Sequence, residues 1–355
     1  MNNLKAKLKN MGKEYAGLII FPENRKYFTH FESSNGYLIV NGEKAVFITD
    51  GRYIEAAEDK ACDCEVLLQE NRIFPQIHNI LNEMGCSHLL VESTHLTVAM
   101  YNSLKGVLKN YKISTDDTLT NMINEIRAVK TPQEVELIVK AQRIAEKSFQ
   151  NILNFIKDGV TEKEIELELN YQMFKNGGEA LSFDTIAISG TNTSMPHGVP
   201  SDKIVRNGDF VTMDFGTMVG GYHSDMTRTV AVGFATDEMA DVYNTVLDAQ
   251  LSCLNGLCSG LSCHDGDKLA RDVIESKGYG QYFTHSTGHS VGVEIHEEPR
   301  LAPHYKEILK TGNIVTVEPG IYIPKKFGVR IEDMALITDN GCENLTKAPK
   351  ELIIL

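Results

Sequence analysis

The stretch Val211–Thr229, VTMDFGTMVGGYHSDMTRT, places Asp214 and Asp225 on either side of a Gly-Gly pair, within two runs rich in β-forming residues. With Val219 and Gly220 as a two-residue turn, the segment predicts a β-hairpin in which Asp214 faces Asp225. Opposed residues on one face of a sheet have Cβ atoms about 5 Å apart, and two like charges there destabilise the pair. We therefore expect a positive charge between these carboxylates.

A second segment, residues 316–338 (TVEPGIYIPKKFGVRIEDMALIT), repeats this arrangement with Glu318 and Glu332. A bend at Lys325, with a proline and a glycine nearby, predicts a hairpin in which these two glutamates lie opposite each other. The two predicted hairpins together present four carboxylates.

A histidine lies between the two hairpins in the sequence. Residues 285–300 (HSTGHSVGVEIHEEPR) place His289 between Gly288 and Gly292, which allow close backbone approach. One imidazole and four carboxylates suit two divalent cations such as Mn²⁺, Co²⁺, Fe²⁺ or Zn²⁺, whereas a structural zinc site prefers Cys and His. The sequence therefore predicts a site for two divalent metal ions, with Mn²⁺ as the first expectation.

These motifs also fit other interpretations. A lone aspartate at a strand end is often a solvated turn residue, so each carboxylate pair alone fits a surface position as well as a metal site. The two pairs together favour the metal site. HEEPR at 296–300 lacks the second histidine of a HExxH zinc site, and no G-x-x-x-x-G-K-[ST] loop occurs. We therefore expect neither a HExxH protease nor a nucleotide-binding protein, and we expect no serine hydrolase.

Composition limits the class of protein. The chain has 355 residues, of which 42% are apolar and 23% are charged, as is usual for a globular protein with a sizeable core. No apolar run reaches the ~18 residues of a membrane span, and no signal segment is recognisable, so we expect a cytoplasmic protein with no membrane contact. Seven cysteines without paired spacing indicate reduced thiols. A net charge of −13 without a basic cluster argues against nucleic-acid binding.

The chain predicts two domains with a boundary near residue 125. In residues 1–124, short apolar strands alternate with helical stretches, which indicates an α/β domain. In residues 125–355, helices and hairpins occur in blocks, which indicates an α+β domain. Thr131 and Thr161, each followed three residues later by a glutamate, predict capping boxes that begin two of these helices.

Several motifs carry a resemblance to a known family. NTSMPHGVPSDKIVRNGDFVTMDFG, GYHSDMTRTV, STGHSVGVEIHEEP, TVEPGIY and VRIEDM resemble, in order and spacing, the pita-bread metallopeptidases: Xaa-Pro dipeptidase (prolidase), aminopeptidase P and methionine aminopeptidase. The resemblance covers residues 125–355. Residues 1–124, including FITDGRYIEAA, resemble the smaller creatinase-type domain of prolidases and aminopeptidase P. The implied fold is an α/β creatinase-like domain followed by an α+β pita-bread catalytic domain.

The resemblance implies a role for each matched residue. The implied metal ligands are Asp214, Asp225, His289, Glu318 and Glu332, with Asp214 and Glu332 bridging both ions. Glu318 is also implied to carry the proton from the attacking water to the leaving nitrogen.

Four further residues are implied to contact the substrate or orient the site. His197 and His296 match the two histidines of the family that bind substrate and stabilise developing charge, and Arg330 matches an arginine that orients the site. Arg300 matches the position at which a dipeptidase binds the free carboxylate of its substrate. His285 is interpreted as a core residue or as a support for the ligands.

The implied activity is hydrolysis of the Xaa-Pro bond of dipeptides, with small peptides carrying proline in second position as substrates and a homodimer as the assembly. The creatinase-like domain favours the proline-specific members over methionine aminopeptidase. Arg300 favours a dipeptidase over an aminopeptidase P acting on longer peptides, which stays an alternative. A creatinase-like enzyme or a metal-free binding module is a further alternative, disfavoured because all five ligand positions are intact.

Overall fold

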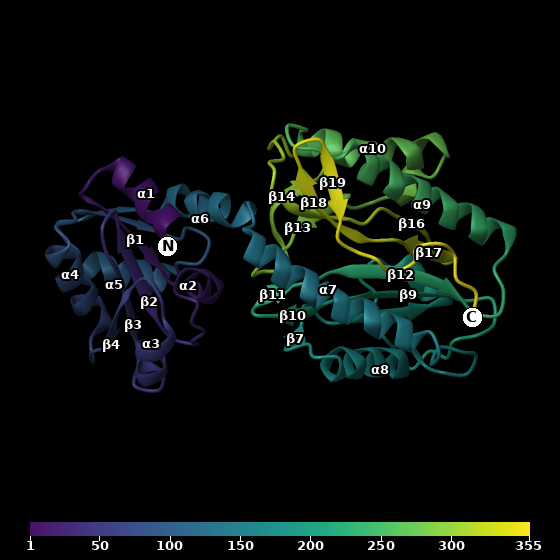
Figure 1. Cartoon of the computed structure of the whole chain (residues 1–355), viewed down its shortest axis with the longest axis horizontal. Helices are drawn as coiled ribbons and strands as arrows, with labels where there is room; N and C mark the ends of the chain where they lie inside the picture. The colour runs from purple at the N-terminus through teal and green to yellow at the C-terminus, as the bar shows by residue number, and fades with distance from the viewer. The chain divides into compact units, whose positions relative to one another are not determined.

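The computed structural model describes residues 1–355 and divides the chain into two compact units, Met1–Arg127 and Ala128–Leu355 (Figure 1). The division falls at the end of helix α6 (Thr118–Ala128), a few residues beyond the boundary expected at 124. No helix combines the length and the apolar character needed to span a membrane.

The N-terminal unit is an α/β domain. Its six strands lie in the order β4-β3-β2-β1-β5-β6, and only β2 runs antiparallel to its neighbours. The strands are β1 (Tyr15–Ile19), β2 (Tyr37–Asn41), β3 (Ala45–Thr49), β4 (Glu65–Leu68), β5 (His88–Val91) and β6 (Lys112–Ser114). The helices are α1 (Asn2–Met11), α2 (Pro22–Thr29), α3 (Ile54–Lys60), α4 (Ile73–Glu83), α5 (Val98–Val107) and α6. Successive strand residues contribute to two separate apolar clusters, so the sheet is covered on both faces.

The C-terminal unit is α+β, with its helices in two pairs. Figure 1 shows α7 (Pro132–Ile152) and α8 (Glu162–Lys175) on one side of the strands, and α9 (Asp237–Gly256) and α10 (Cys263–Ser276) on the other. Both predicted capping boxes are present: Thr131 and Thr161 each accept a hydrogen bond from the backbone of the glutamate three residues later.

The strands of this unit form four small sheets. Their orders are β11-β10-β7, β12-β9-β8, β14-β13-β15-β18-β19 and β16-β17. The strands are β7 (Ala180–Leu181), β8 (Ile186–Ser189), β9 (Phe210–Phe215), β10 (Thr217–Val219), β11 (Tyr222–His223), β12 (Met226–Ala231), β13 (Gly288–Ser290), β14 (Glu297–Leu301), β15 (Ile314–Val317), β16 (Gly320–Ile323), β17 (Phe327–Arg330), β18 (Asp333–Thr338) and β19 (Gly341–Asn344). Two short 3₁₀ turns, η1 (Gly190–Ser194) and η2 (Gly280–Tyr282), complete the unit.

The register predicted for the first hairpin is wrong by two residues. Val219 pairs with Tyr222, so the turn is Gly220–Gly221, and Asp214 lies opposite Thr227 rather than Asp225. Both glycines have positive φ, 59° and 81°, as a tight hairpin turn of this kind requires, and valine at the first position would be strained there.

The register predicted for the second hairpin is confirmed. Ile323 pairs with Phe327 around the bend, and the strands that continue outward keep the same register, with Val317 opposite Asp333. This register places Glu318 and Glu332 opposite each other where the two strand pairs meet. Lys325, at the centre of the bend, has a positive φ of 63°.

Candidate metal centre

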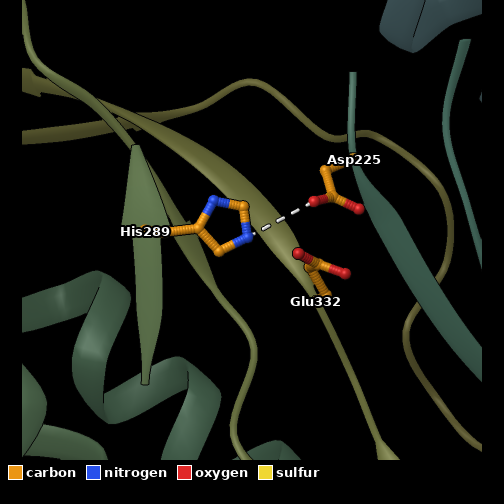
Figure 2. Close-up of side chains that lie close together, drawn as sticks. All are labelled: Asp225, His289 and Glu332. Atoms are coloured by element: carbon orange, nitrogen blue, oxygen red, sulfur yellow. Dashed lines mark ion pairs between the residues drawn. The ribbon is translucent and has the colours of Figure 1, made fainter. Parts of the chain in front are cut away.

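Three side chains from separate segments converge on one point in the C-terminal unit. Asp225 immediately precedes β12, His289 lies in β13, and Glu332 immediately precedes β18. One potential ligand atom from each lies within 4.8 Å of the others, and all three residues are buried (Figure 2). The ion pair drawn there joins His289 Nε2 to Asp225 Oδ2 over 3.5 Å.

Two further carboxylates adjoin this group. Glu318 Oε1 lies 3.4 Å from His289 Nε2, and Asp214 belongs to the same cluster of interacting charges. A cavity of about 520 Å³ opens onto all of them. Its lining includes every site residue expected from the sequence: His197, Asp214, Asp225, His289, His296, Arg300, Glu318, Arg330 and Glu332.

The carboxylates are too crowded to be ionised together without a cation. Burial, followed by repulsion from neighbouring carboxylates, raises the pKa of Asp225 and of Glu332 well above the usual range. Burial is also the main cause that raises the pKa of Glu318 to about 8. A divalent cation would remove this penalty, because each carboxylate could then stay ionised at neutral pH.

The donor atoms fit such a cation. Asp214 Oδ1, Asp225 Oδ1 and Glu332 Oε1 are buried and have no hydrogen-bond partner within the protein, which is costly unless a further group binds them. The second oxygen of Glu332 accepts a 2.7 Å hydrogen bond from Thr227 Oγ1. One oxygen is thus held by the protein and the other is free to bind a metal.

The histidine is in the tautomer that a metal requires. His289 Nδ1 lies 3.1 Å from the carbonyl oxygen of Ser290, and because a carbonyl only accepts, Nδ1 carries the proton. Nε2 therefore presents its lone pair to the carboxylates. Burial, followed by the neighbouring His296, lowers the pKa of His289 to about 3, so the ring is neutral at physiological pH.

Arg330 connects one carboxylate to a chain of buried polar groups. Its Nη2 donates to Asp214 Oδ2 at 2.6 Å and its Nη1 donates to the hydroxyl of Tyr322 at 2.9 Å. The Tyr322 hydroxyl lies 2.9 Å from His285 Nε2, and His285 lines the cavity. No motif or spacing in the sequence points to Tyr322, whereas His285 lies four residues before His289 in the same motif.

The two histidines expected to contact substrate lie on the cavity wall. The His296 ring packs edge-on to that of His289, with centroids 4.4 Å apart, and burial followed by the charge of Arg300 lowers its pKa. His197 is exposed, in the segment that follows η1. The carbonyl of the preceding Pro196 accepts a 3.3 Å hydrogen bond from Arg330 Nη1.

Arg300 lies in β14, and of the two arginines expected at the site it has the more accessible side chain. Its side chain is 42% exposed, and its single ion pair, with Glu298, is 3.4 Å long. Such a guanidinium can bind an incoming carboxylate at little cost, because it gives up few interactions within the protein.

A serine-nucleophile pattern, G-x-S-x-G, occurs at residues 288–292 (GHSVG). The structure excludes that chemistry, because Ser290 is buried in β13, and its hydroxyl accepts a 3.1 Å hydrogen bond from the ammonium of Lys130. A serine nucleophile needs an exposed hydroxyl on a strand-to-helix turn, with a base beside it.

Residues 136–339 match metallopeptidase family M24, and residues 1–129 match the creatinase/prolidase N-terminal domain. An Xaa-Pro dipeptidase of Pyrococcus furiosus is 37% identical over 333 residues, covering 94% of this chain and 93% of the relative. The solved Xaa-Pro dipeptidase from Bacillus anthracis superposes with a TM-score of 0.94 at 41% identity, covering 99% and 98% of the two chains. An X-Pro aminopeptidase from Thermotoga maritima gives a TM-score of 0.90 at 33% identity, covering 98% and 100%. The chain therefore belongs to metallopeptidase family M24, with a creatinase/prolidase N-terminal domain and a pita-bread catalytic domain.

Proposed function

We propose that this protein is a dinuclear-metal-dependent Xaa-Pro dipeptidase that hydrolyses the Xaa-Pro bond of small peptides. The observation that carries the proposal is the buried convergence of Asp225, His289 and Glu332 in a cavity that Arg300 also lines. Membership of an M24 metallopeptidase family implies that this centre binds divalent metal. Similarity to Xaa-Pro dipeptidases over nearly the whole chain supports the substrate class.

We assign the metal ligands to Asp214, Asp225, His289, Glu318 and Glu332, for two ions, with Mn²⁺ preferred and Co²⁺, Zn²⁺ or Fe²⁺ as alternatives. Bound metal would supply an acidified water molecule and polarise the scissile carbonyl.

The geometry favours Asp225 over Asp214 as a bridging ligand. Asp225 and Glu332 belong, with His289, to the group whose potential ligand atoms lie within 4.8 Å of one another, and Asp214 lies outside that group. We therefore propose Asp225 and Glu332 as the shared ligands, in place of the pair Asp214 and Glu332 expected from the resemblance.

The protein's own groups can carry out the remaining steps. Glu318 takes a proton from the attacking water and returns it to the proline nitrogen, a role that suits a buried carboxylate beside the nucleophile. His296 and His197, on the cavity wall, donate hydrogen bonds to the carbonyl oxygen as negative charge develops on it. Arg330 holds Asp214 in place through the hydrogen bond from its Nη2 to Asp214 Oδ2.

Arg300 supports a dipeptidase, because the carboxylate of an Xaa-Pro dipeptide is the natural partner of an accessible arginine in this cavity. An Xaa-Pro aminopeptidase acting on longer peptides is the second candidate, and the likeness to the Thermotoga maritima enzyme supports it. A homodimer is the assembly that we propose from the resemblance of the N-terminal domain.

The proposal is tested by metal analysis and by turnover of three substrates. Purified protein loaded with Mn²⁺ is expected to hold two ions per chain and to cleave Leu-Pro faster than Leu-Pro-Ala, with no cleavage of Leu-Ala. Faster cleavage of Leu-Pro-Ala would favour the aminopeptidase, and equal cleavage of Leu-Ala would contradict proline specificity.

A further inference from the structure

A buried carboxylate lies at the start of helix α8, outside the metal centre. Glu162 is completely buried and forms no ion pair, although an isolated buried carboxylate is costly. Hydrogen bonds offset the cost: its Oε1 accepts from the backbone N–H of Ser189 at 2.7 Å, from the Ser189 hydroxyl at 3.0 Å and from Asn192 Nδ2 at 2.9 Å. Each of these bonds satisfies an acceptor position that burial would otherwise leave without a partner.

The other oxygen of Glu162 holds a second segment. Its Oε2 accepts from the backbone N–H of Ser201 at 3.0 Å and from the Ser201 hydroxyl at 2.6 Å. Ser189 and Ser201 bracket residues 190–200, so one carboxylate joins the two ends of this loop. Ser189 is the last residue of β8, which fixes one end of the loop to a sheet.

The loop that Glu162 closes carries His197. The His197 ring is exposed, so its position follows from the path of the loop backbone. Within the loop, Pro196 and His197 line the cavity of the metal centre. We call the hydrogen bonds of Glu162 to Ser189 and Ser201 the clamp. The loop is also held by strand β17, where Gly328 N donates to Thr193 Oγ1 at 2.8 Å.

Only a carboxylate suits this position. Glutamine would keep one acceptor oxygen but would turn an NH₂ donor toward either the Ser189 or the Ser201 backbone N–H, so one end of the loop would lose its acceptor. An apolar side chain at this position could stabilise the fold as well as the carboxylate does, but it could not bind the two ends of the loop. The buried carboxylate therefore serves to fix the loop.

We infer that Glu162 is a positioning residue for catalysis, which sets the place of His197 by closing the 190–200 loop. The inference rests on the role of His197 given in the proposed function. It predicts that Glu162 affects turnover through the loop that carries His197, and that Glu162 itself touches neither substrate nor metal.

The test compares Glu162→Gln with Glu164→Gln, two residues along the same helical turn. Glu164 is exposed and its carboxylate accepts from Thr161 N at 2.7 Å, so it caps the helix without reaching the loop. Glu162→Gln is expected to keep its metal content and its KM for Leu-Pro within about twofold while kcat falls by about tenfold to a hundredfold. Amide hydrogen exchange in residues 190–201 should accelerate in this variant alone. Glu164→Gln should lower Tm and leave kcat and this exchange unchanged.

A double-mutant cycle with His197→Ala separates positioning from general destabilisation. If Glu162 acts through His197, the double variant loses no more kcat than His197→Ala alone, and additive losses would overturn the inference. If Glu162→Gln keeps wild-type turnover while His197→Ala loses turnover, the inference about Glu162 is also overturned. The proposed function would then be unaffected. Wild-type turnover in His197→Ala would instead contradict the role assigned to that histidine. If Glu162→Gln does not fold, Ser201→Ala removes only one of the clamp's hydrogen bonds, and should show the same pattern with a smaller loss.

Discussion

Arg330 donates a 2.6 Å hydrogen bond from Nη2 to Oδ2 of Asp214, and both side chains line the candidate metal centre. The guanidinium is itself buried, so it neutralises part of this carboxylate's charge where water cannot. Asp225 and Glu332 have no such cation in direct contact. A bound cation would therefore offset the most uncompensated negative charge at the point where these two residues meet His289.

Asp225→Asn and Glu332→Gln are expected to abolish turnover and to reduce bound metal while the protein stays folded. Each substitution keeps the shape of the side chain but removes a charge that the cations need. Metal content by mass spectrometry, turnover of Leu-Pro and the circular dichroism spectrum check the prediction. Near wild-type turnover with two metals bound in either variant would contradict the proposed dinuclear centre.

His296→Ala is expected to keep two metal ions and to lose turnover by on the order of 10²-fold, because His296 lies on the cavity wall and is not assigned as a ligand. Its ring touches that of His289, so metal affinity is the necessary control. Isothermal titration of Mn²⁺ into the metal-free variant should match wild type. A variant that fails to bind metal would make His296 a ligand.

The metal-free protein should become less stable as pH rises. In the folded protein the pKa of Glu318 is raised to about 8, and the pKa values of Asp225 and Glu332 are also raised. In the unfolded chain, carboxyl groups have a pKa of about 4. Raised acid pKa values favour the protonated folded form, so the stability that these three carboxyl groups contribute is complete below about pH 4 and is lost as pH rises toward about 8. The lowered pKa of His289 acts in the opposite direction below about pH 6.5, but one histidine is outweighed by three carboxyl groups.

Thermal unfolding of chelator-treated protein at pH 5.5 and pH 8 checks this sign. Tm should be lower at pH 8, and Mn²⁺ should raise Tm more at pH 8 than at pH 5.5, because metal binding requires deprotonated ligands. Glu318→Gln removes one of the titrating groups and should flatten the metal-free Tm profile. An unchanged profile in this variant would show that another group is responsible.

Much of this site could be predicted from the sequence, because its ligands sit in hairpins and local rules fix hairpin pairing. The second hairpin was predicted in register from its bend at Lys325. The predicted register of the first hairpin is wrong because it places the turn at Val219–Gly220. Only Gly220–Gly221 supplies positive φ at both turn positions.

The remaining parts of the site depend on contacts between distant segments. Tyr322 meets His285 across 37 residues of sequence, and Glu162 meets Ser201 across 39. No periodicity or motif encodes such pairs, because they form only when separate sheets and helices pack. The same limit applies to Lys130, whose buried partner Glu297 lies 167 residues away.

Lys130→Met is expected to destabilise the protein by roughly 3–5 kcal/mol, since both side chains of the Lys130–Glu297 pair are almost fully buried and the substitution removes the ammonium group that pairs with the Glu297 carboxylate. Lys140→Met is the matched control, because its ion pair with Glu136 is exposed and should contribute roughly 0.5 kcal/mol. Urea unfolding of metal-free variants measures both. Equal losses in the two variants would mean that Glu297 is stabilised by other groups.

Arg300→Ala is expected to raise KM for Leu-Pro with little change in kcat. Arg300 is accessible in the cavity and weakly paired, so its guanidinium can bind the free carboxylate of a dipeptide. A charged hydrogen bond contributes roughly 1.5–3 kcal/mol, which corresponds to a rise in KM of about tenfold to a hundredfold. Leu-Pro-Ala carries its carboxylate one residue further away, so its cleavage should change little.

The comparison of these two peptides distinguishes the dipeptidase from the aminopeptidase. If Arg300 recognises the carboxylate, Arg300→Lys should restore part of the affinity, because it keeps the charge but loses the two-pronged geometry. A loss that is equal for Leu-Pro and Leu-Pro-Ala would mean that Arg300 supports the cavity wall near Glu298 rather than the substrate. A rise in Leu-Pro-Ala cleavage in Arg300→Ala would mean that this side chain restricts longer peptides, and dipeptide selectivity would then be steric as well as electrostatic.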